Sequence, residues 1–443
     1  MLPTDGTGAL DLDQIQGTIL RERPMPYVGA YLLYEVGDAA QGRTMLSRLL
    51  PYVTTAAGWE HPTEDAWLNV VLTHEGLAGI GVPQDILDGF PREFREPMRT
   101  RNEFLGDIGE SDPAHWDLPE RGAFHIGLVL MAPDDASFAA KFAIGQSAHA
   151  DLPGIRRVAR LDIRPPENLR EHFGFADGIS RPYIEGQGGE PAPGQVRAKA
   201  GEFVLGYVDE LGKVATGPGP ETLWRNGTYL SIRKLHQKVA EFRRFLHTHA
   251  DDEYGQELLA AKMVGRWRSG CPLALSPDKD VSFEHERLND FAYYDDDPRG
   301  LKTPASSHIR RVNPRDALQD TIVDVRLHRL LRRGAVYGPM LPEGVMEDDG
   351  VDRGLVLAFA NANPGRQFEF VQSQWVNDGD FISAGTNQDP IAGNHIADGD
   401  YTYPAKPVRR HLRGLPAFVV TKGGEHVFLP SVSGLEYLAA GRW

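Results

Sequence analysis

Two short segments of the chain gather residue types that can move protons or bind a metal. The first, residues 171–182, has the sequence EHFGFADGISRP and places Asp177 in a GxxDG pattern. Burial among Phe173, Phe175 and Ile179 would desolvate the carboxylate and raise its pKa, so that it could exchange protons. An Asp-Gly pair can equally form a simple turn in which the carboxylate bonds its own backbone. The motif alone leaves both interpretations of Asp177 open.

The second segment, SHIRRVNPR at residues 307–315, places His308 among arginines. A neutral imidazole can ligate a metal, and the guanidinium fork of arginine suits carboxylates or phosphates. Arg311 follows His308 by three positions and would share its face of a helix. The chain has 15 histidines, so an ordinary buried or surface histidine is the alternative. The basic neighbours are what favour a metal ligand beside an anion-binding group.

A third segment, HRLLRRGAVYGP at residues 328–339, is rich in both arginine and apolar residues. Its pattern predicts an apolar helix that Arg332 and Arg333 close, just before a turn at Gly334. Arginine near a helix C-terminus is also favoured by the helix dipole without any further function. The segment therefore adds chemistry only in combination with the other two.

The composition excludes several classes of site. Cys271 is the only cysteine, which rules out an internal disulfide, a four-thiolate zinc or iron-sulfur centre, and CxxCH attachment of haem. The GxxxxGK[ST], GxSxG and HExxH motifs are absent, as is a GxGxxG that opens a helix. Any metal would therefore be held by histidine or carboxylate.

Charge and hydropathy limit the partners and the location. The net charge of -15 would repel nucleic acid and an anionic membrane surface. The first residues show no basic segment followed by an apolar run and no twin arginine, and no later stretch approaches ~18 apolar residues. We expect a cytoplasmic protein that binds neither nucleic acid nor membrane.

The apolar pattern predicts an α+β protein with a recurring strand-helix order. In the first half we expect strands at residues 27–36, 66–73 and 123–132 and a helix at residues 39–50. In the second half we expect strands at residues 228–234 and 355–361 and a helix at residues 237–249. The Gly- and Pro-rich residues 185–201 predict a surface linker between the halves. A chain of this length would exceed a single core, so two domains are expected.

Taken together, three motifs resemble the dye-decolourising peroxidase family in kind, order and approximate spacing. They are GFADGISRP, the run NDFAYYDDDPRGLKTPASSHIRRVNPR, and HRLLRRGAVYGP. The resemblance continues through DLDQIQGTIL near the N-terminus, MVGRWRSGCPL before His308, and LVLAFANANPGRQFEFVQSQW after it. It covers nearly the whole chain and is similar to the longer bacterial and fungal branches of the family.

The resemblance implies an α+β fold of two ferredoxin-like domains with antiparallel sheets and haem bound in the C-terminal one. We expect residues 1–200 to form the N-terminal domain with the GxxDG motif and residues 201–443 to form the haem-binding domain. The implied cofactor is one haem b per chain, with His308 as the iron ligand, Asp177 as the distal acid and Arg332 as the distal arginine. The other implied cofactor-binding residues are Gly178, Ile179, Arg311, Leu357, Phe359 and Asp389.

The resemblance also implies roles for four of these residues. Leu357 and Phe359 would shape the distal pocket. Asp389, in GTNQDPIAG, would accept the second N–H of His308, because a ligating imidazole normally donates its other nitrogen to an acceptor. Arg311 would pair with a haem propionate.

The implied activity is the reduction of hydrogen peroxide through a ferryl intermediate, with bulky dyes, phenolics or similar one-electron donors as reducing substrates. Asp177 would act first as base and then as acid, and Arg332 would stabilise the developing negative charge. One alternative is a haem-binding or haem-handling protein with only incidental turnover, which would not need Asp177 or Arg332. The other is a cofactor-free module whose arginine-rich segments bind an acidic partner.

Overall fold

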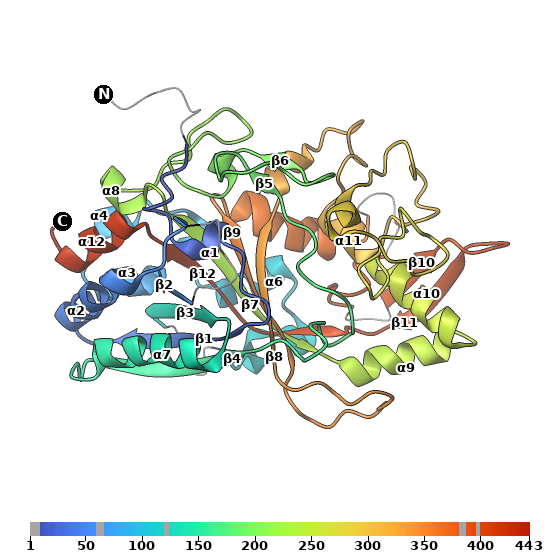
Figure 1. Ribbon diagram of the computed structural model, residues 1–443, viewed down its shortest axis with the longest axis horizontal. Coiled ribbons are helices and arrows are strands. Elements are labelled where there is room, and N and C mark those ends of the chain that lie inside the picture. Colours follow the sequence, from blue (N-terminus) through green and yellow to red (C-terminus); the bar gives the residue numbers. More distant parts are fainter. Residues whose placement is uncertain (1–8, 59–65, 119–123, 381–386, 396–398) are drawn as a thin grey trace.

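The fold is built on one large antiparallel sheet. The computed structural model describes residues 9–58, 66–118, 124–380, 387–395 and 399–443. Its main sheet has eight strands in the order β4-β1-β3-β2-β12-β7-β9-β8. Two small sheets, β5-β6 and β10-β11, accompany it. Figure 1 shows helices of the N-terminal half at one end of the molecule and α9, α10 and α11 at the other.

The first four strands form a ferredoxin-like unit. The chain runs strand, helix, strand, strand, helix, strand, and the four strands pair in the order 4-1-3-2. The elements are β1 (Val28–Val36), α2 (Ala39–Leu49), β2 (Trp67–Leu72), β3 (Ile126–Ala132), α7 (Asp135–His149) and β4 (Ile155–Ile163). Short helices lie around them: α1 (Gly17–Leu20), α3 (His74–Gly79), α4 (Gln84–Leu87), α5 (Arg92–Arg95) and α6 (Asn102–Leu105).

The last four strands of the main sheet repeat this order. Their elements are β7 (Thr228–Gln237), β8 (Leu331–Tyr337), β9 (Gly354–Asn361) and β12 (Val419–Leu429), arranged as β12-β7-β9-β8. The accompanying helices are α8 (Glu221–Trp224), α9 (Val239–His249), α10 (Glu253–Val264), α11 (His308–Val312) and α12 (Val432–Ala440). The repeated order confirms the predicted α+β class with ferredoxin-like units.

The two units share backbone pairing, so they are not separate bodies. Strand β12 pairs with β2 at Phe428 and Leu72, and helix α12 lies beside α2 and α8 (Figure 1). The two outer strands of the sheet also meet: the N–H of Arg164, directly after β4, donates to the carbonyl of Val336 in β8 at 2.9 Å. The division at residues 200 and 201 stays a prediction.

Strand β1 is apolar on both faces because other elements cover both faces. Ala30, Leu32 and Tyr34 belong to one hydrophobic cluster, which includes residues of α2 and α12. Tyr31 and Leu33, which point the other way, belong to a second cluster with residues of β8 and β9. Burial on both faces explains why the strand is an uninterrupted apolar run in the sequence.

Most of the predicted elements have the expected positions. The exceptions are the segment 328–339, which contains β8 in place of the predicted helix, and two smaller differences. Ala123, the first residue of one predicted strand, lies outside the described residues, and β3 begins at Ile126. The predicted linker is not a plain loop, because it contains β6 (Arg197–Ala198), which pairs in parallel with β5 (Tyr183–Ile184). Strands β10 (Gly399–Tyr403) and β11 (Arg410–Leu415) form a further hairpin.

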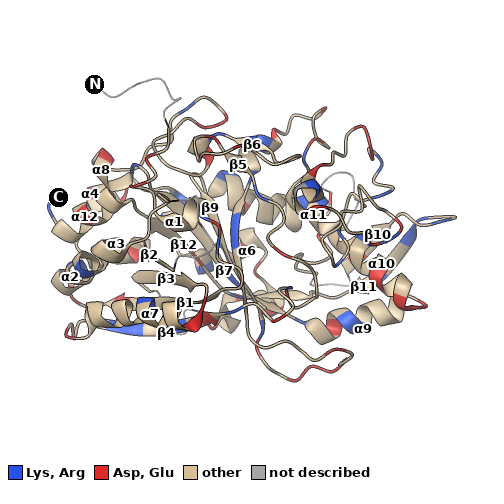
Figure 2. Cartoon of the chain, viewed as in Figure 1, with Lys and Arg blue, Asp and Glu red and all other residues tan. Residues whose placement is uncertain are grey.

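Positions occupied by Lys or Arg and by Asp or Glu are interspersed along the elements of both halves (Figure 2). None of the helices in the ranges that the structure describes is long and apolar enough to cross a membrane.

Candidate active site

A cavity of about 370 Å³ brings together the three motif segments. Its wall includes residues of β7, β8, β9 and β12, the start of α11 and the loop at residues 171–182. Seven of the residues singled out from the sequence line it: Asp177, Gly178, Ile179, His308, Arg332, Leu357 and Phe359. Segments far apart in the sequence therefore meet at one site.

His308 is the first residue of α11, and its Nδ1 faces a buried carboxylate. Nδ1 lies 2.8 Å from Oδ2 of Asp389, whose side chain is 0% exposed. The other oxygen, Oδ1, accepts the backbone N–H groups of Ile391 and Ala392, each at 2.9 Å. Burial alone would raise the pKa of Asp389, but His308 and these two donors outweigh it and hold that pKa below its ordinary value.

The ionised carboxylate of Asp389 fixes the tautomer of His308. A carboxylate can only accept a hydrogen bond, so Nδ1 of His308 carries the proton. In the neutral form of the ring Nε2 keeps a lone pair, and among the described residues His308 makes its side-chain hydrogen bond through Nδ1. In that form the imidazole can ligate a metal in the cavity through Nε2.

Asp177 contacts a different arginine through each carboxylate oxygen. Oδ1 accepts a hydrogen bond from Nη2 of Arg332, and Oδ2 lies 3.2 Å from Nη2 of Arg23. Burial alone would raise the pKa of Asp177, but the charges of Arg332 and Arg23 outweigh it and hold that pKa well below its ordinary value. Burial and Arg332 could displace this pKa in either direction, and the second guanidinium, that of Arg23, helps to decide the direction downward.

Arg332 lies in a strand and not at the end of a helix, which corrects the prediction for residues 328–339. In β8, Arg332 is opposite Phe359 and Arg333 is opposite Ala358 of β9. Successive strand residues point to opposite faces, so only Arg332 faces the cavity. Arg333 instead donates to the carbonyls of Thr18 and Ile19, at 3.0 and 2.6 Å. Pairing with β9 overrides the local helical pattern.

Arg311 does not reach the wall of the cavity. The residue is fully buried, and its Nε and Nη1 donate to the carbonyls of Trp375 and Asn387 at 2.6 and 2.8 Å. Its Nη2 donates to the carbonyl of Asp378. The guanidinium ties together the backbone behind His308, so a propionate contact by Arg311 has no support in this geometry.

The cavity wall holds polar residues that the sequence analysis missed. Arg315, from the same motif as His308, lies 3.9 Å above the ring of Phe291, and its Nη1 donates to the carbonyls of Asn289 and Phe291 at 3.0 and 3.1 Å. Tyr293 is fully buried on this wall, and its hydroxyl has no partner among the described residues. The basic motif could have suggested Arg315, whereas no local signal marks Tyr293.

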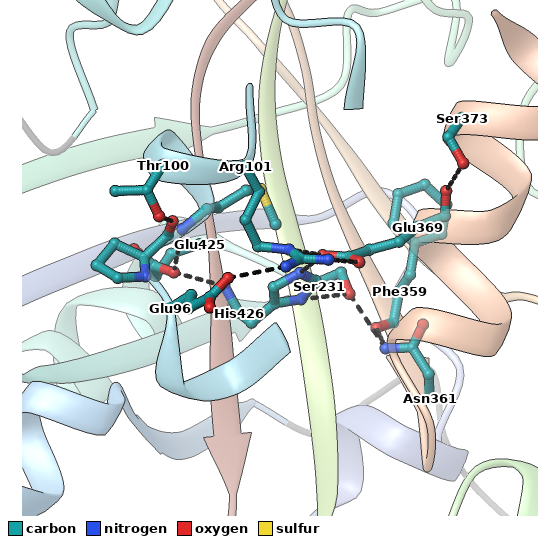
Figure 3. Close-up of polar contacts among 12 residues, drawn as sticks. Glu96, Thr100, Arg101, Ser231, Phe359, Asn361, Glu369, Ser373, Glu425 and His426 are labelled. Atoms are coloured by element: carbon teal, nitrogen blue, oxygen red, sulfur yellow. Dashed lines mark hydrogen bonds and ion pairs between the residues drawn. The ribbon is translucent and has the colours of Figure 1, made fainter. Parts of the chain in front are cut away.

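A buried polar network supports the wall behind Phe359. The ring of Phe368 stacks on Phe359 at 5.2 Å between centroids and meets His426 edge-on at 5.9 Å. Figure 3 shows His426 between Ser231 and Glu369, at 2.9 Å from Oγ and 3.1 Å from Oε1. Burial would raise the pKa of Glu369, but hydrogen bonds from His426 and Arg101 lower it. The network fixes aromatic side chains that line the cavity.

The donor set fits a haem. An imidazole with a free Nε2 suits the iron, and Leu357, Phe359 and Ile179 give the apolar surface that a flat macrocycle needs. The unpartnered hydroxyl of Tyr293 can donate to a carboxylate substituent. Within the part of the chain that the structure describes, no group of three or more His, Cys, Asp or Glu side chains is placed to hold a bare metal ion.

Comparisons with known proteins find peroxidases among the relatives of this chain. The chain is 32% identical to a dye-decolorizing peroxidase of Mycena epipterygia, over 98% of this chain and 88% of that protein. It is 26% identical to a multifunctional dye peroxidase of an Amycolatopsis strain, over 98% of this chain and 97% of that protein. No protein-family model matches the chain.

Solved structures give the same result. An ancestral D-type dye-decolorizing peroxidase superposes with a TM-score of 0.85 at 31% identity, over 97% of this chain and 99% of that one. A dye-decolorizing peroxidase in complex with 2,6-dimethoxyphenol superposes with a TM-score of 0.84 at 27% identity, over 97% of this chain and 100% of that one. The chain belongs to the dye-decolourising peroxidase family and is therefore a peroxidase.

Proposed function

We propose that the cavity binds one haem b per chain through His308 and catalyses the reduction of hydrogen peroxide by one-electron donors. The observation that carries the proposal is that two hydrogen-bonded groups of side chains meet at one cavity. One is the His308–Asp389 pair, and the other is Asp177 with its arginines.

The residues that would hold the haem follow from the fit. His308 would ligate the iron through Nε2, and Asp389 would keep Nδ1 protonated and the ring fixed. Gly178, Ile179, Leu357 and Phe359, which line the cavity, would contact the macrocycle. We replace Arg311 by Arg315 and Tyr293 as the groups that would meet the acidic substituents, because both line the cavity. A bound haem supplies an iron that passes electrons one at a time from the donor to peroxide.

Asp177 and Arg332 would carry the proton and the charge. The ionised carboxylate of Asp177 would take a proton from hydrogen peroxide and return it to the departing oxygen, which leaves as water. Charge separates across the O–O bond in this step. The guanidinium of Arg332, already beside Asp177, would stabilise the negative charge on the departing oxygen without solvent reorganisation.

The reducing substrates would be dyes, phenolics or similar small donors. The proposal draws on the names of the relatives, which are dye-decolorizing peroxidases, and on the relative in complex with 2,6-dimethoxyphenol. We also propose that the haem belongs to a C-terminal domain of residues 201–443, since β7, β8, β9 and β12 all contribute to the cavity wall.

The proposal is tested by mixing haem-loaded protein with one equivalent of hydrogen peroxide in a stopped-flow spectrometer. The variants are Asp177→Asn and Arg332→Leu, with Arg48→Gln as a control that removes a partly exposed arginine paired with Asp151. We expect the rate of the absorbance change to fall by about 10²–10⁴ in Asp177→Asn, the usual contribution of general acid-base catalysis. Wild-type rates in both distal variants would contradict the proposal and favour haem handling with incidental turnover.

A further inference from the structure

We propose that Arg23 is a positioning residue for the peroxide reaction. It holds the carboxylate of Asp177 in place while Arg332 acts on the substrate. The inference rests on the proposed function, because it extends the role given to Asp177.

The geometry divides Asp177 between two arginines. Arg332 takes Oδ1 and Arg23 takes Oδ2, so neither guanidinium competes for the same oxygen. The side chain of Arg332 is 35% exposed, whereas that of Arg23 is 16% exposed. Arg332 is thus the arginine with room to turn towards a ligand in the cavity. Arg23 stays on the far oxygen and keeps the carboxylate oriented.

Arg23 is itself held by contacts to the strand that carries Arg332. Its guanidinium carbon lies 4.9 Å from the centre of the Tyr27 ring, a cation-π distance. The hydroxyl of Tyr27 accepts the N–H of Val336 in β8 at 2.7 Å. Arg333 of the same strand donates to the carbonyls of Thr18 and Ile19 in α1, the helix just before Arg23 in the chain. The N-terminal segment is therefore docked on β8, and this docking brings Arg23 to the site.

The charged and titratable groups that face Asp177 explain why a second cation matters. Arg332, Arg23 and the backbone N–H of Gly178 favour the ionised form, whereas burial opposes it. Burial and the charge of Asp177 in turn raise the pKa of the nearby Glu171 and Tyr27, which favours the neutral form of both. Without Arg23, a single and partly exposed arginine would balance the buried carboxylate. The carboxylate would then protonate at a higher pH and would lose one of its two anchors.

The test compares the pH dependence of kcat/KM for hydrogen peroxide in wild type, Arg23→Gln and Arg23→Lys, with Arg48→Gln as the control. An opposite charge at this distance shifts a carboxyl pKa by one unit or more. We expect the acid limb of the profile to move up by about 1 pH unit in Arg23→Gln and to return towards wild type in Arg23→Lys. An acid limb that does not move in Arg23→Gln would overturn the inference, whether or not the rate falls equally at every pH.

A second measurement uses the haem-free protein. Urea unfolding at pH 7 of Arg23→Gln, Asp177→Asn and the double variant gives the coupling between the two side chains. We expect Arg23→Gln to change the unfolding equilibrium constant about tenfold more with Asp177 present than with Asn at that position, because one pKa unit is a tenfold effect. Additive effects would overturn the inference. The proposed function fails separately, if Asp177→Asn and Arg332→Leu both react with peroxide at the wild-type rate.

Discussion

Replacing Asp389 by Asn should reverse the tautomer of His308 while it leaves the shape of the side chain nearly unchanged. Oδ1 of Asp389 accepts two backbone N–H groups, from Ile391 and Ala392, and Oδ2 faces Nδ1 of His308. An Asn in this place would keep its oxygen on the two N–H donors, since turning the amide would leave both unsatisfied at a cost of about 1–3 kcal/mol each. Its NH2 group would then point at Nδ1 of His308.

The reversed tautomer should weaken haem binding. Facing a donor, Nδ1 must accept, so the proton moves to Nε2 and the lone pair that would ligate iron is lost. Restoring the ligating tautomer sets two N–H groups against each other and costs about 1–3 kcal/mol, roughly 10–100-fold in affinity. The assay is a haemin titration of the apoprotein followed by the Soret band, with Asp400→Asn as the control because Asp400 is 30% exposed. Equal affinities and equal spectra for Asp389→Asn and wild type would refute this reasoning.

Two further predictions follow from the charged groups. Because neighbouring arginines lower the pKa of Asp177, its carboxylate stays ionised down to pH values below about 3.9, the ordinary value. The peroxide reaction should lose rate only below that pH, and a stopped-flow series in which the rate already falls by pH 5 would speak against this. In the network of Figure 3, Glu369→Ala removes the partner of Arg101 and His426 and should cost about 3–5 kcal/mol in urea unfolding. Glu221→Ala, at an exposed pair, should cost under about 1 kcal/mol, and equal losses in the two variants would refute the assignment.

The sequence predicts elements well where burial imposes a period. The strand expected at residues 27–36 is β1, Val28–Val36, and the helix expected at residues 39–50 is α2, Ala39–Leu49. Both have apolar faces that their neighbours cover, and Asp38 caps α2 by accepting the N–H of Gln41 at 2.9 Å. The error at residues 328–339 has the opposite cause, because β8 owes its strand structure to pairing with β9.

The site could be predicted as far as its motifs extend. The motifs bring His308, Asp177 and Arg332 to one cavity, as the family resemblance implies. Spacing alone does not tell which of several neighbouring arginines turns towards that cavity: the sequence suggests Arg311, whereas Arg315 lies on the cavity wall. Arg23 contacts Asp177 across 154 positions of the sequence. No local pattern reports such a pair, and only the docking of the N-terminal segment on β8 reveals it.

The most direct test of the account is whether His308 ligates the iron of a bound haem. Wild type and His308→Ala are titrated with haemin, and the visible spectrum is recorded before and after addition of imidazole. The account predicts one equivalent of haem bound with a histidine-ligated spectrum in wild type, loss of that spectrum in His308→Ala, and its recovery when imidazole is added. A His308→Ala protein that binds haemin with the wild-type affinity and spectrum would contradict the central claim.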